Sequence, residues 1–520
     1  MRNWTSGLAV LAAASALSAP ASAGVKGDIN GDGFADLAAG APQEAIDAIG
    51  NAGSASVIYG SSTGLAAAGN QLFWQGQPSI VGTAEAGDGY GWALASGDFN
   101  NDGRADLAVG APGEAVGTVR GAGAVSVLYG SASGLTASGN QILSQGSAGL
   151  AETAEQADAF GDAIATGDFD GDGFGDLAIG VPGEDIGSGS TFLKNVGAAQ
   201  IVYGSPTGLV PSDGQVLVQG QGGVEGTTES FDRFGGSLAA GNFGKSAAAD
   251  LAVGVPDEAV GSRVSAGSVN VLYGGTAGLS TTGDQIFSQG VGGLVGTSEA
   301  GDRFGAALAA GDFGNGTSAD LAIGTPEESI GARDDAGSVA VIYGSATGLT
   351  TTGNQGWVQG QAGLPGTAET GDFFGASLAA ADIGAGNAQD LVVGAPDEDV
   401  GAVEDAGAVS TIFGSTSGLV ATNAQILSQG DSFGVNDRAE RGDGFGWALA
   451  AGQFGRSAKA DVAIGAPYEN YGSANAGIVN VLYGTASGLT GSGDQIFAQG
   501  TGGLAGTREA RDLFGFGLAP

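Results

Sequence analysis

The chain has 520 residues, 104 of them Gly, and its 55 acidic residues against 16 basic ones give a formal charge of -39. This charge excludes nucleic acids as partners, because proteins bind them by neutralising phosphates with Lys and Arg. The chain has no Cys and no His, which excludes disulfides, His/Cys zinc sites and His-based catalytic triads. Carboxylate chemistry remains, either with hard cations or as acid/base pairs.

The N-terminus has the parts of a secretory signal peptide. Arg2 is followed by an apolar run over residues 8–17 and by Ala21-Ser22-Ala23, a small-residue cleavage site. The apolar run is about half the ~20 residues that a membrane span needs, and no later segment qualifies. We therefore expect a signal peptide over residues 1–23, cleavage near Ala23, and a secreted, periplasmic or extracellular protein without a membrane span.

The rest of the chain is a sevenfold repeat. The pattern Asp-Leu-Ala-x-Gly-x-Pro, or a close variant, begins at Asp36, Asp106, Asp176, Asp250, Asp320, Asp390 and Asp461. A Val-Leu-Tyr-Gly-like segment and an aromatic-Gly pair also occur seven times each. The steps between units are 70, 70, 74, 70, 70 and 71 residues.

Each unit holds four short apolar runs bounded by Gly, Asp, Asn or Pro. In residues 90–146 these runs are YGWALASGDF, DLAVGAP, GAVSVLYG and QILSQG. Four strands repeated seven times predict an all-β fold, a seven-bladed β-propeller of four-stranded blades. A right-handed β-helix is the alternative, but its coils are much shorter than 70 residues.

The two ends of the chain complement each other. The first unit lacks an aromatic-Gly segment, whereas the chain ends in FGFGLAP, residues 514–520. Because an open ring would expose strand edges, we predict that residues 514–520 complete the blade begun at 24–75. Residues 24–520 would then form a single closed propeller.

The first three units carry oxygen ligands at alternate positions of a nine-residue turn. Ca²⁺ takes six to eight hard oxygen ligands with flexible geometry, and crowded carboxylates would repel one another without a cation. An Asp/Asn/Gly turn that only caps backbone amides is the alternative. The predicted side-chain ligands are Asp28, Asn30, Asp32 and Asp36, Asp98, Asn100, Asp102 and Asp106, and Asp168, Asp170, Asp172 and Asp176. The predicted carbonyl ligands are those of Phe34, Arg104 and Phe174.

The equivalent turns of units 4–7 keep the length but lose the ligands. They read NFGKSAAAD, DFGNGTSAD, DIGAGNAQD and QFGRSAKAD. We expect no Ca²⁺ there and turns held by backbone hydrogen bonds alone.

Further acids recur on the other side of every unit. A Glu follows each Pro by two residues, as Glu114 does, and a Glu-x-x-Asp pattern such as Glu85 to Asp88 precedes each aromatic-Gly pair. Up-and-down strand order places all of them on the face opposite the predicted Ca²⁺ turns. They either cap loop amides or form an acidic binding face. Arg441-Gly442-Asp443 arises within this repeated pattern and is interpreted as a coincidence.

Units 2 and 3, YGWALASGDFNNDGRADLAVGAP and FGDAIATGDFDGDGFGDLAIGVP, resemble the FG-GAP repeat of the integrin α-chain N-terminal β-propeller. The resemblance covers nearly all of residues 24–520. It implies a seven-bladed propeller with Ca²⁺ in the hairpin loops of one face and ligand contact on the other. The metal-type turns lie in the first three units, whereas several consecutive later blades carry metal in integrin α-chains. The sequence shows no inserted metal-dependent adhesion domain, leg domains, transmembrane helix or Cys, so we do not expect heterodimeric receptor function. The composition resembles secreted bacterial proteins made only of such repeats.

The sequence therefore predicts a secreted, Ca²⁺-stabilised, monomeric propeller that is not an enzyme and acts as a binding or adhesion module for a protein or glycan. Two other functions remain open. One is a glycosidase or polysaccharide lyase, for which a blade-specific acid such as Asp47, Asp185 or Asp399 would be the candidate. The other is a structural surface or matrix component.

Overall fold

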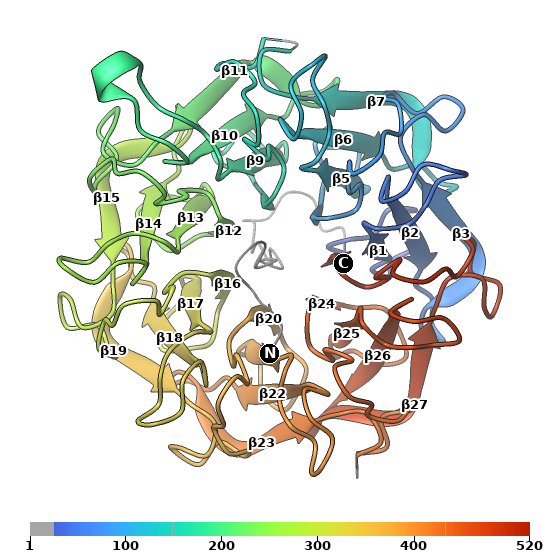
Figure 1. Cartoon of the computed structure of the whole chain (residues 1–520). Helices are drawn as coiled ribbons and strands as arrows, with labels where there is room; N and C mark the ends of the chain where they lie inside the picture. The colour runs from blue at the N-terminus through green and yellow to red at the C-terminus, as the bar shows by residue number, and fades with distance from the viewer. Residues whose placement is uncertain (1–24, 148, 432) are drawn as a thin grey trace.

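The computed structural model describes residues 25–147, 149–431 and 433–520. The predicted signal peptide lies outside these residues. The described chain is all-β except for one short 3₁₀ turn, η1 (Gly189–Thr191). Its strands form seven four-stranded antiparallel sheets arranged as a ring (Figure 1). The predicted seven-bladed β-propeller is confirmed.

Blades are numbered in chain order, and their strands are given from the innermost to the outermost. Blade 1 contains β28 (Leu518–Ala519), β1 (Leu37–Ala41), β2 (Ser54–Tyr59) and β3 (Ala66–Phe73). Blade 2 contains β4 (Leu94–Gly97), β5 (Asp106–Ala111), β6 (Ala124–Tyr129) and β7 (Thr136–Leu143). Blade 3 contains β8 (Ile164–Gly167), β9 (Asp176–Val181), β10 (Ala198–Tyr203) and β11 (Val210–Leu217). Blade 4 contains β12 (Ser237–Gly241), β13 (Asp250–Val255), β14 (Ser268–Tyr273) and β15 (Ser280–Phe287).

The remaining three blades follow the same order. Blade 5 contains β16 (Ala307–Gly311), β17 (Asp320–Thr325), β18 (Ser338–Tyr343) and β19 (Thr350–Trp357). Blade 6 contains β20 (Ser377–Ala381), β21 (Asp390–Ala395), β22 (Ala408–Phe413) and β23 (Val420–Leu427). Blade 7 contains β24 (Leu449–Gly452), β25 (Asp461–Ala466), β26 (Ile478–Thr485) and β27 (Gly488–Phe497).

The middle strands of each blade are buried on both faces, whereas the outer strand is half exposed. In blade 2, every residue of β5 and β6 is buried, but β7 has exposed positions in its first half. The fourth apolar run of the sequence begins at Gln141, whereas the strand begins five residues earlier, at Thr136. The first part of the strand faces solvent and is mostly polar, so an apolar pattern does not reveal it.

Close approach between neighbouring blades requires the small residues of the repeat. A Cβ atom added to Gly110 of β5 would lie 2.2 Å from the carbonyl oxygen of Gly161, which precedes β8 of the next blade. That distance is far inside van der Waals contact, so only Gly fits at this position. Apolar side chains of adjacent blades then fill the space between the sheets.

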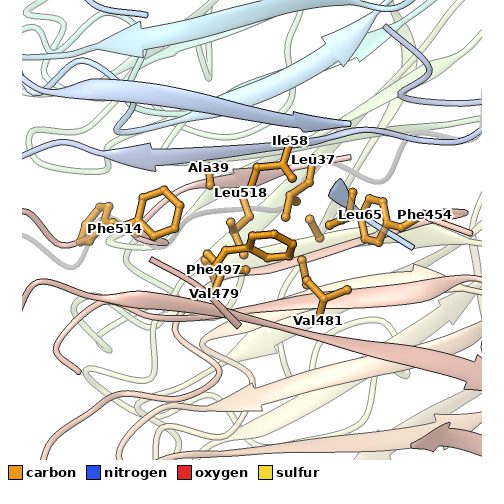
Figure 2. Close-up of a cluster of buried hydrophobic side chains, with 14 of the residues drawn as sticks. Leu37, Ala39, Ile58, Leu65, Phe454, Val479, Val481, Phe497, Phe514 and Leu518 are labelled. Carbon is orange, nitrogen blue, oxygen red and sulfur yellow. The ribbon is translucent and has the colours of Figure 1, made fainter. Parts of the chain in front are cut away.

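The ring is closed by pairing the last strand with the first unit. Ala519 pairs with Ala38 and Leu518 with Ala39, so β28 becomes the innermost strand of blade 1. Figure 2 shows the core under this joint, where Leu37, Ile58 and Leu518 of blade 1 pack with Val479, Val481 and Phe497 of blade 7. Closure by the two ends of the chain is confirmed.

Candidate metal centres and the acidic face

The predicted Ca²⁺ turns are the hairpin loops between the two innermost strands of blades 1–3. In the first loop the Asp28 carboxylate accepts hydrogen bonds from the backbone N–H groups of Gly31 (2.6 Å) and Gly33 (2.8 Å). Asn30 Oδ1 accepts one from the N–H of Asp32 (2.8 Å). In the second loop Asp98 accepts the N–H groups of Asp102 and Gly103, and in the third loop Asp168 accepts those of Asp172 and Gly173. The side-chain oxygens are therefore turned inward over a tight loop.

The last Asp of the loop has a structural role in every blade. Asp36 is fully buried, and its two oxygens accept the N–H groups of Gly60 (2.8 Å) and Ile29 (2.9 Å). The first of these bonds recurs at Asp106, Asp176, Asp250, Asp320, Asp390 and Asp461. This residue is thus needed with or without other acids in the loop, and each oxygen keeps a second lone pair for a cation.

Carboxylates converge most closely in blade 3. One oxygen from each of Asp168, Asp170 and Asp176 lies within 4.8 Å of the others. Asp172 is outside this group, and its Oδ1 accepts the N–H of Phe174 (2.9 Å). The loops of blades 1 and 2 place the amide oxygens of Asn30 and Asn100 where blade 3 has Asp170. A set of hard oxygen donors at this spacing fits a Ca²⁺ ion.

Burial and charge repulsion both disfavour the ionised loop carboxylates. Burial raises the pKa of Asp106 and of Asp176 to about 8, and it raises the pKa of Asp320, in a loop without the acid pattern, to about 8 as well. Burial, together with repulsion from Asp172, raises the pKa of Asp168 and of Asp170. A bound cation would remove this repulsion in the first three blades.

The expectation that the loops of blades 4–7 rely on backbone hydrogen bonds alone is wrong. Lys459 of blade 7 forms an ion pair with Asp382 in the loop of blade 6, with an Nζ to Oδ1 distance of 2.6 Å. Lys245 lies 3.5 Å from the centre of the Tyr273 ring, and Arg456 lies 3.9 Å from that of Tyr483. Cationic side chains therefore lie near the loops of blades 4, 6 and 7. Lys459 reaches the loop of the neighbouring blade, whereas Lys245 and Arg456 contact rings of their own blades.

The loops of all seven blades are linked in a ring. The carbonyl of the first loop residue accepts the N–H of the eighth loop residue of the next blade, as Asp28 does from Ala105 at 2.8 Å. The other acceptors are Asp98, Asp168, Asn242, Asp312, Asp382 and Gln453, and the last of these accepts from Ala35 of blade 1. A cation held in one loop would therefore also fix the backbone that contacts the neighbouring blade.

The opposite face carries the repeated acids, and here they cap loops. The Asp before each aromatic-Gly pair accepts the N–H of the Glu three residues earlier, as Asp88 does from Glu85 at 2.5 Å. The same bond recurs at Asp158, Asp232, Asp302, Asp372, Asp443 and Asp512. The Glu after each Pro is buried, and Gln75 donates to Glu114 (2.9 Å) in the bond typical of this position. Burial, followed by repulsion from Asp88, raises the pKa of Glu114 to about 7.

Three sequence features on this face have structural roles. Asp443 of the Arg-Gly-Asp tripeptide is fully buried, so its carboxylate is not presented to a receptor. Asp185 and Asp399 cap their own loops by accepting the N–H groups of Asn195 (2.7 Å) and Asp405 (3.0 Å). Asp47 lies on an exposed turn.

The sequence reasoning missed a break in the repeat on the same face. The loop between β9 and β10 contains η1 and presents Phe192, which is 49% exposed. The next loop on this face presents Phe231, 54% exposed, and the Phe231 N–H donates to the carbonyl of Lys194 (2.8 Å). The 74-residue step between Asp176 and Asp250 was the available signal, because an insertion in a regular repeat lies in a loop.

Comparisons with known proteins agree with this architecture. The FG-GAP repeat family matches residues 21–58, 90–128 and 160–203, the three units with acidic loops. The chain is 36% identical over 161 residues to integrin alpha-PS5 of Drosophila melanogaster (30% of this chain, 14% of that protein) and 34% identical over 155 residues to integrin alpha-6 of Gallus gallus (29% and 12%). The fold and these matches together support an FG-GAP, integrin-like β-propeller.

The chain is also similar to an enzyme. It is 33% identical over 187 residues to phosphatidylinositol-glycan-specific phospholipase D of Bos taurus, which is 36% of this chain and 21% of that protein. The chain thus matches about a fifth of that relative's length. Among solved structures, a rhamnogalacturonan lyase of Bacillus licheniformis aligns over 88% of this chain and 81% of its own, with 9% identity and a TM-score of 0.33. Within the described residues, no helix is long and apolar enough to span a membrane.

Proposed function

We propose that this protein is an exported, calcium-stabilised β-propeller that binds a protein or glycan ligand on its acidic face, the face of the loops between β9 and β10 and between β11 and β12. The observation that carries the binding role is the exposed pair of Phe192, in the one large insertion of the repeat, and Phe231, in the next loop on this face. Neighbouring exposed aromatic side chains are rare on a surface without a partner, and they supply much of the binding energy in interfaces.

The calcium part of the proposal rests on the loops of blades 1–3. Ca²⁺ would be held by the side-chain oxygens of Asp28, Asn30, Asp32 and Asp36 and their counterparts, with the carbonyls of Phe34, Arg104 and Phe174. When bound, the ion supplies the positive charge that the crowded carboxylates lack. The convergence of Asp168, Asp170 and Asp176 supports this arrangement. These loops lie on the face opposite Phe192, so the metal acts on the scaffold and not on the ligand.

Export is inferred from the N-terminal sequence. The charge at Arg2, the apolar run over residues 8–17 and the Ala21-Ser22-Ala23 site have the order of a signal peptide. Mass spectrometry of the protein recovered from the medium or periplasm should show a chain that begins at Gly24. Recovery of the full-length chain from the cytoplasm alone would contradict export.

The binding role is tested with a ligand screen and paired variants. The purified protein is applied to arrays of glycans and matrix proteins, with Ca²⁺ and with EDTA. For any ligand found, Phe192→Ala with Phe231→Ala should weaken binding by at least tenfold. Phe433→Ala, which removes a side chain that is 40% exposed on another loop of this face, is the matched control and should leave binding unchanged. Equal effects of both changes would contradict a site at the insertion.

The phospholipase D activity in the bovine relative's name belongs to a protein of which this chain matches about a fifth. It is not part of the proposal.

A further inference from the structure

One position of the acidic face has an unusual backbone conformation in every blade. It lies in the loop between the outer strand of one blade and the inner strand of the next, and its φ is positive. The residues there are Gly82, Glu152, Gly226, Gly296, Gly366, Asp437 and Gly506. Glycine is the expected residue because a Cβ destabilises left-handed backbone. Two loops therefore replace the favoured residue with an acid.

A side chain at this position points toward the buried Gln that holds the repeated Glu. A Cβ on Gly226 would meet Gln219 Cγ at 2.5 Å, and one on Gly296 would meet Gln289 Nε2 at 2.9 Å. At the junction of blades 6 and 7, the equivalent Gln429 donates from Nε2 to Glu469 Oε2 (3.4 Å). Asp437 accordingly repels the charge on Glu469.

Three acids meet at this junction, and a fourth is nearby. One oxygen from each of Glu440, Asp443 and Glu469 lies within 4.8 Å of the others, and Asp437, outside this group, repels the charges on Asp443 and Glu469. The nearby Arg441 is directed elsewhere, with its Nη2 2.7 Å from Glu404 Oε2 at the surface. After burial, repulsion from neighbouring carboxylates raises the pKa of Asp443 and of Glu469.

Buried oxygens without donors are the second, independent observation. Asp443 is fully buried, and its Oδ2 accepts the Glu440 N–H (2.6 Å). Its Oδ1 has no N–H donor, and the side chain meets the carboxyl group of Glu469. Gln429 is 2% exposed, and its Oε1 is unpartnered like that of the equivalent Gln in the other six blades, whereas the unpartnered buried Oδ2 of Asp437 belongs to this junction. Unpartnered buried oxygens are costly. The structure describes the Asp before the aromatic-Gly pair in all seven blades, and its Oδ1 is buried and unpartnered at Asp158 and Asp443. These are the two blade junctions where an acid replaces the Gly of positive φ.

We propose that Asp437, Glu440, Asp443 and Glu469, with the amide oxygen of Gln429, bind a hard divalent cation of the Ca²⁺ class. Carboxylate and amide oxygens are the ligands that such an ion prefers. This site lies on the face opposite the loops of blades 1–3, and it does not depend on whether those loops bind metal. The cation places positive charge between Asp443 and Glu469, whose side chains are in contact. The only other way to relieve two facing carboxylates is a shared proton.

The test counts bound ions by equilibrium dialysis with ⁴⁵Ca²⁺ at pH 7.5. Asp437→Gly should bind one ion fewer per chain than the wild type. This change restores the residue that the repeat favours at a φ of 78°, so the variant should fold, with a melting temperature in EDTA equal to or above that of the wild type. Glu440→Gln, which changes an exposed side chain, should also lose one ion.

The matched control is Glu369→Gln at the junction of blades 5 and 6, where Gly366 leaves the cluster with three acids. It should bind as many ions as the wild type. Equal stoichiometry in all four proteins would overturn the proposal and leave a shared proton as the explanation.

Anomalous diffraction from crystals soaked in Mn²⁺ separates this site from the loops. The expected result is a peak between Asp443 and Glu469. Peaks in the loops of blades 1–3 without one at the junction would reject this inference and leave the proposed function standing. A peak at the junction alone would support this inference and reject the proposed calcium sites in the loops of blades 1–3.

Discussion

The inner hairpin loops of blades 1–3 and those of blades 4–7 occupy the same place in the fold but are held by different means. Both groups have a buried last Asp that accepts the N–H of the Gly at or directly after the end of the third strand, and both belong to the same ring of backbone hydrogen bonds. Blades 1–3 fill the loop with side-chain oxygens, whereas Lys245, Lys459 and Arg456 lie in or beside the loops of blades 4, 6 and 7.

The comparison shows that the same loop backbone forms with the ligand-rich pattern and without it. We expect a cation from solvent in the first group, whereas the chain itself supplies cationic side chains near the loops of blades 4, 6 and 7. The difference should therefore appear as calcium dependence of stability and not as a difference in fold.

The largest expected effect comes from removing calcium from the whole protein. If each loop of blades 1–3 binds one ion at 100 times its Kd, each contributes about 2.7 kcal/mol to the free energy of unfolding. Excess EDTA should lower the melting temperature measured by scanning calorimetry. An unchanged melting curve would remove the proposed distinction between the two groups of loops.

The second effect is a dependence on pH that both groups should share without metal. Burial raises the pKa of Asp176 and of Asp320 to about 8 in the folded chain. Since the folded state then holds these protons more tightly than the unfolded state, stability falls as the pH rises from about 4 to about 8. In EDTA the melting temperature should be higher at pH 5 than at pH 8. In Ca²⁺ the fall should be smaller, because the ion replaces the protons in blades 1–3. A fall of the same size with and without Ca²⁺ would argue against metal in these loops.

A smaller, local effect distinguishes single loops. Asp168→Asn should remove most of the calcium-dependent stability of one site, about 2–3 kcal/mol. Asp312→Asn alters the equivalent residue of blade 5, where the carboxylate caps Gly314 as an amide oxygen also could. It should change the free energy of unfolding by less than ~0.5 kcal/mol, equally with and without Ca²⁺. Denaturant titration of both variants under the two conditions measures the difference.

The smallest effect concerns the side-chain cation of blades 6 and 7. Lys459→Met removes the ion pair with Asp382, and both side chains are partly exposed. Such pairs contribute about 0–1 kcal/mol, so the loss should be of this size and independent of Ca²⁺. A larger loss that added Ca²⁺ restores would mean that the loop of blade 6 accepts metal once its cationic partner is removed.

The sequence by itself determined the number of blades, their strands and the turns rich in oxygen ligands. Strand alternation, turn residues and ligand spacing are local, and a repeat of about 70 residues presents the same local pattern seven times. The unmatched ends, FGFGLAP at residues 514–520 and the missing segment before Gly27, also predicted the closure that pairs Ala519 with Ala38.

The tertiary structure alone decided which side chains of different blades meet. Lys459 reaches Asp382, 77 residues away, and Asp437 joins Glu469 and Gln429 at the junction of blades 6 and 7. The local pattern also did not show that Asp172 stays outside the group formed by Asp168, Asp170 and Asp176. The physical reason is that strand and turn preferences act over a few residues, whereas these contacts depend on how closely and at what angle two blades pack around the ring.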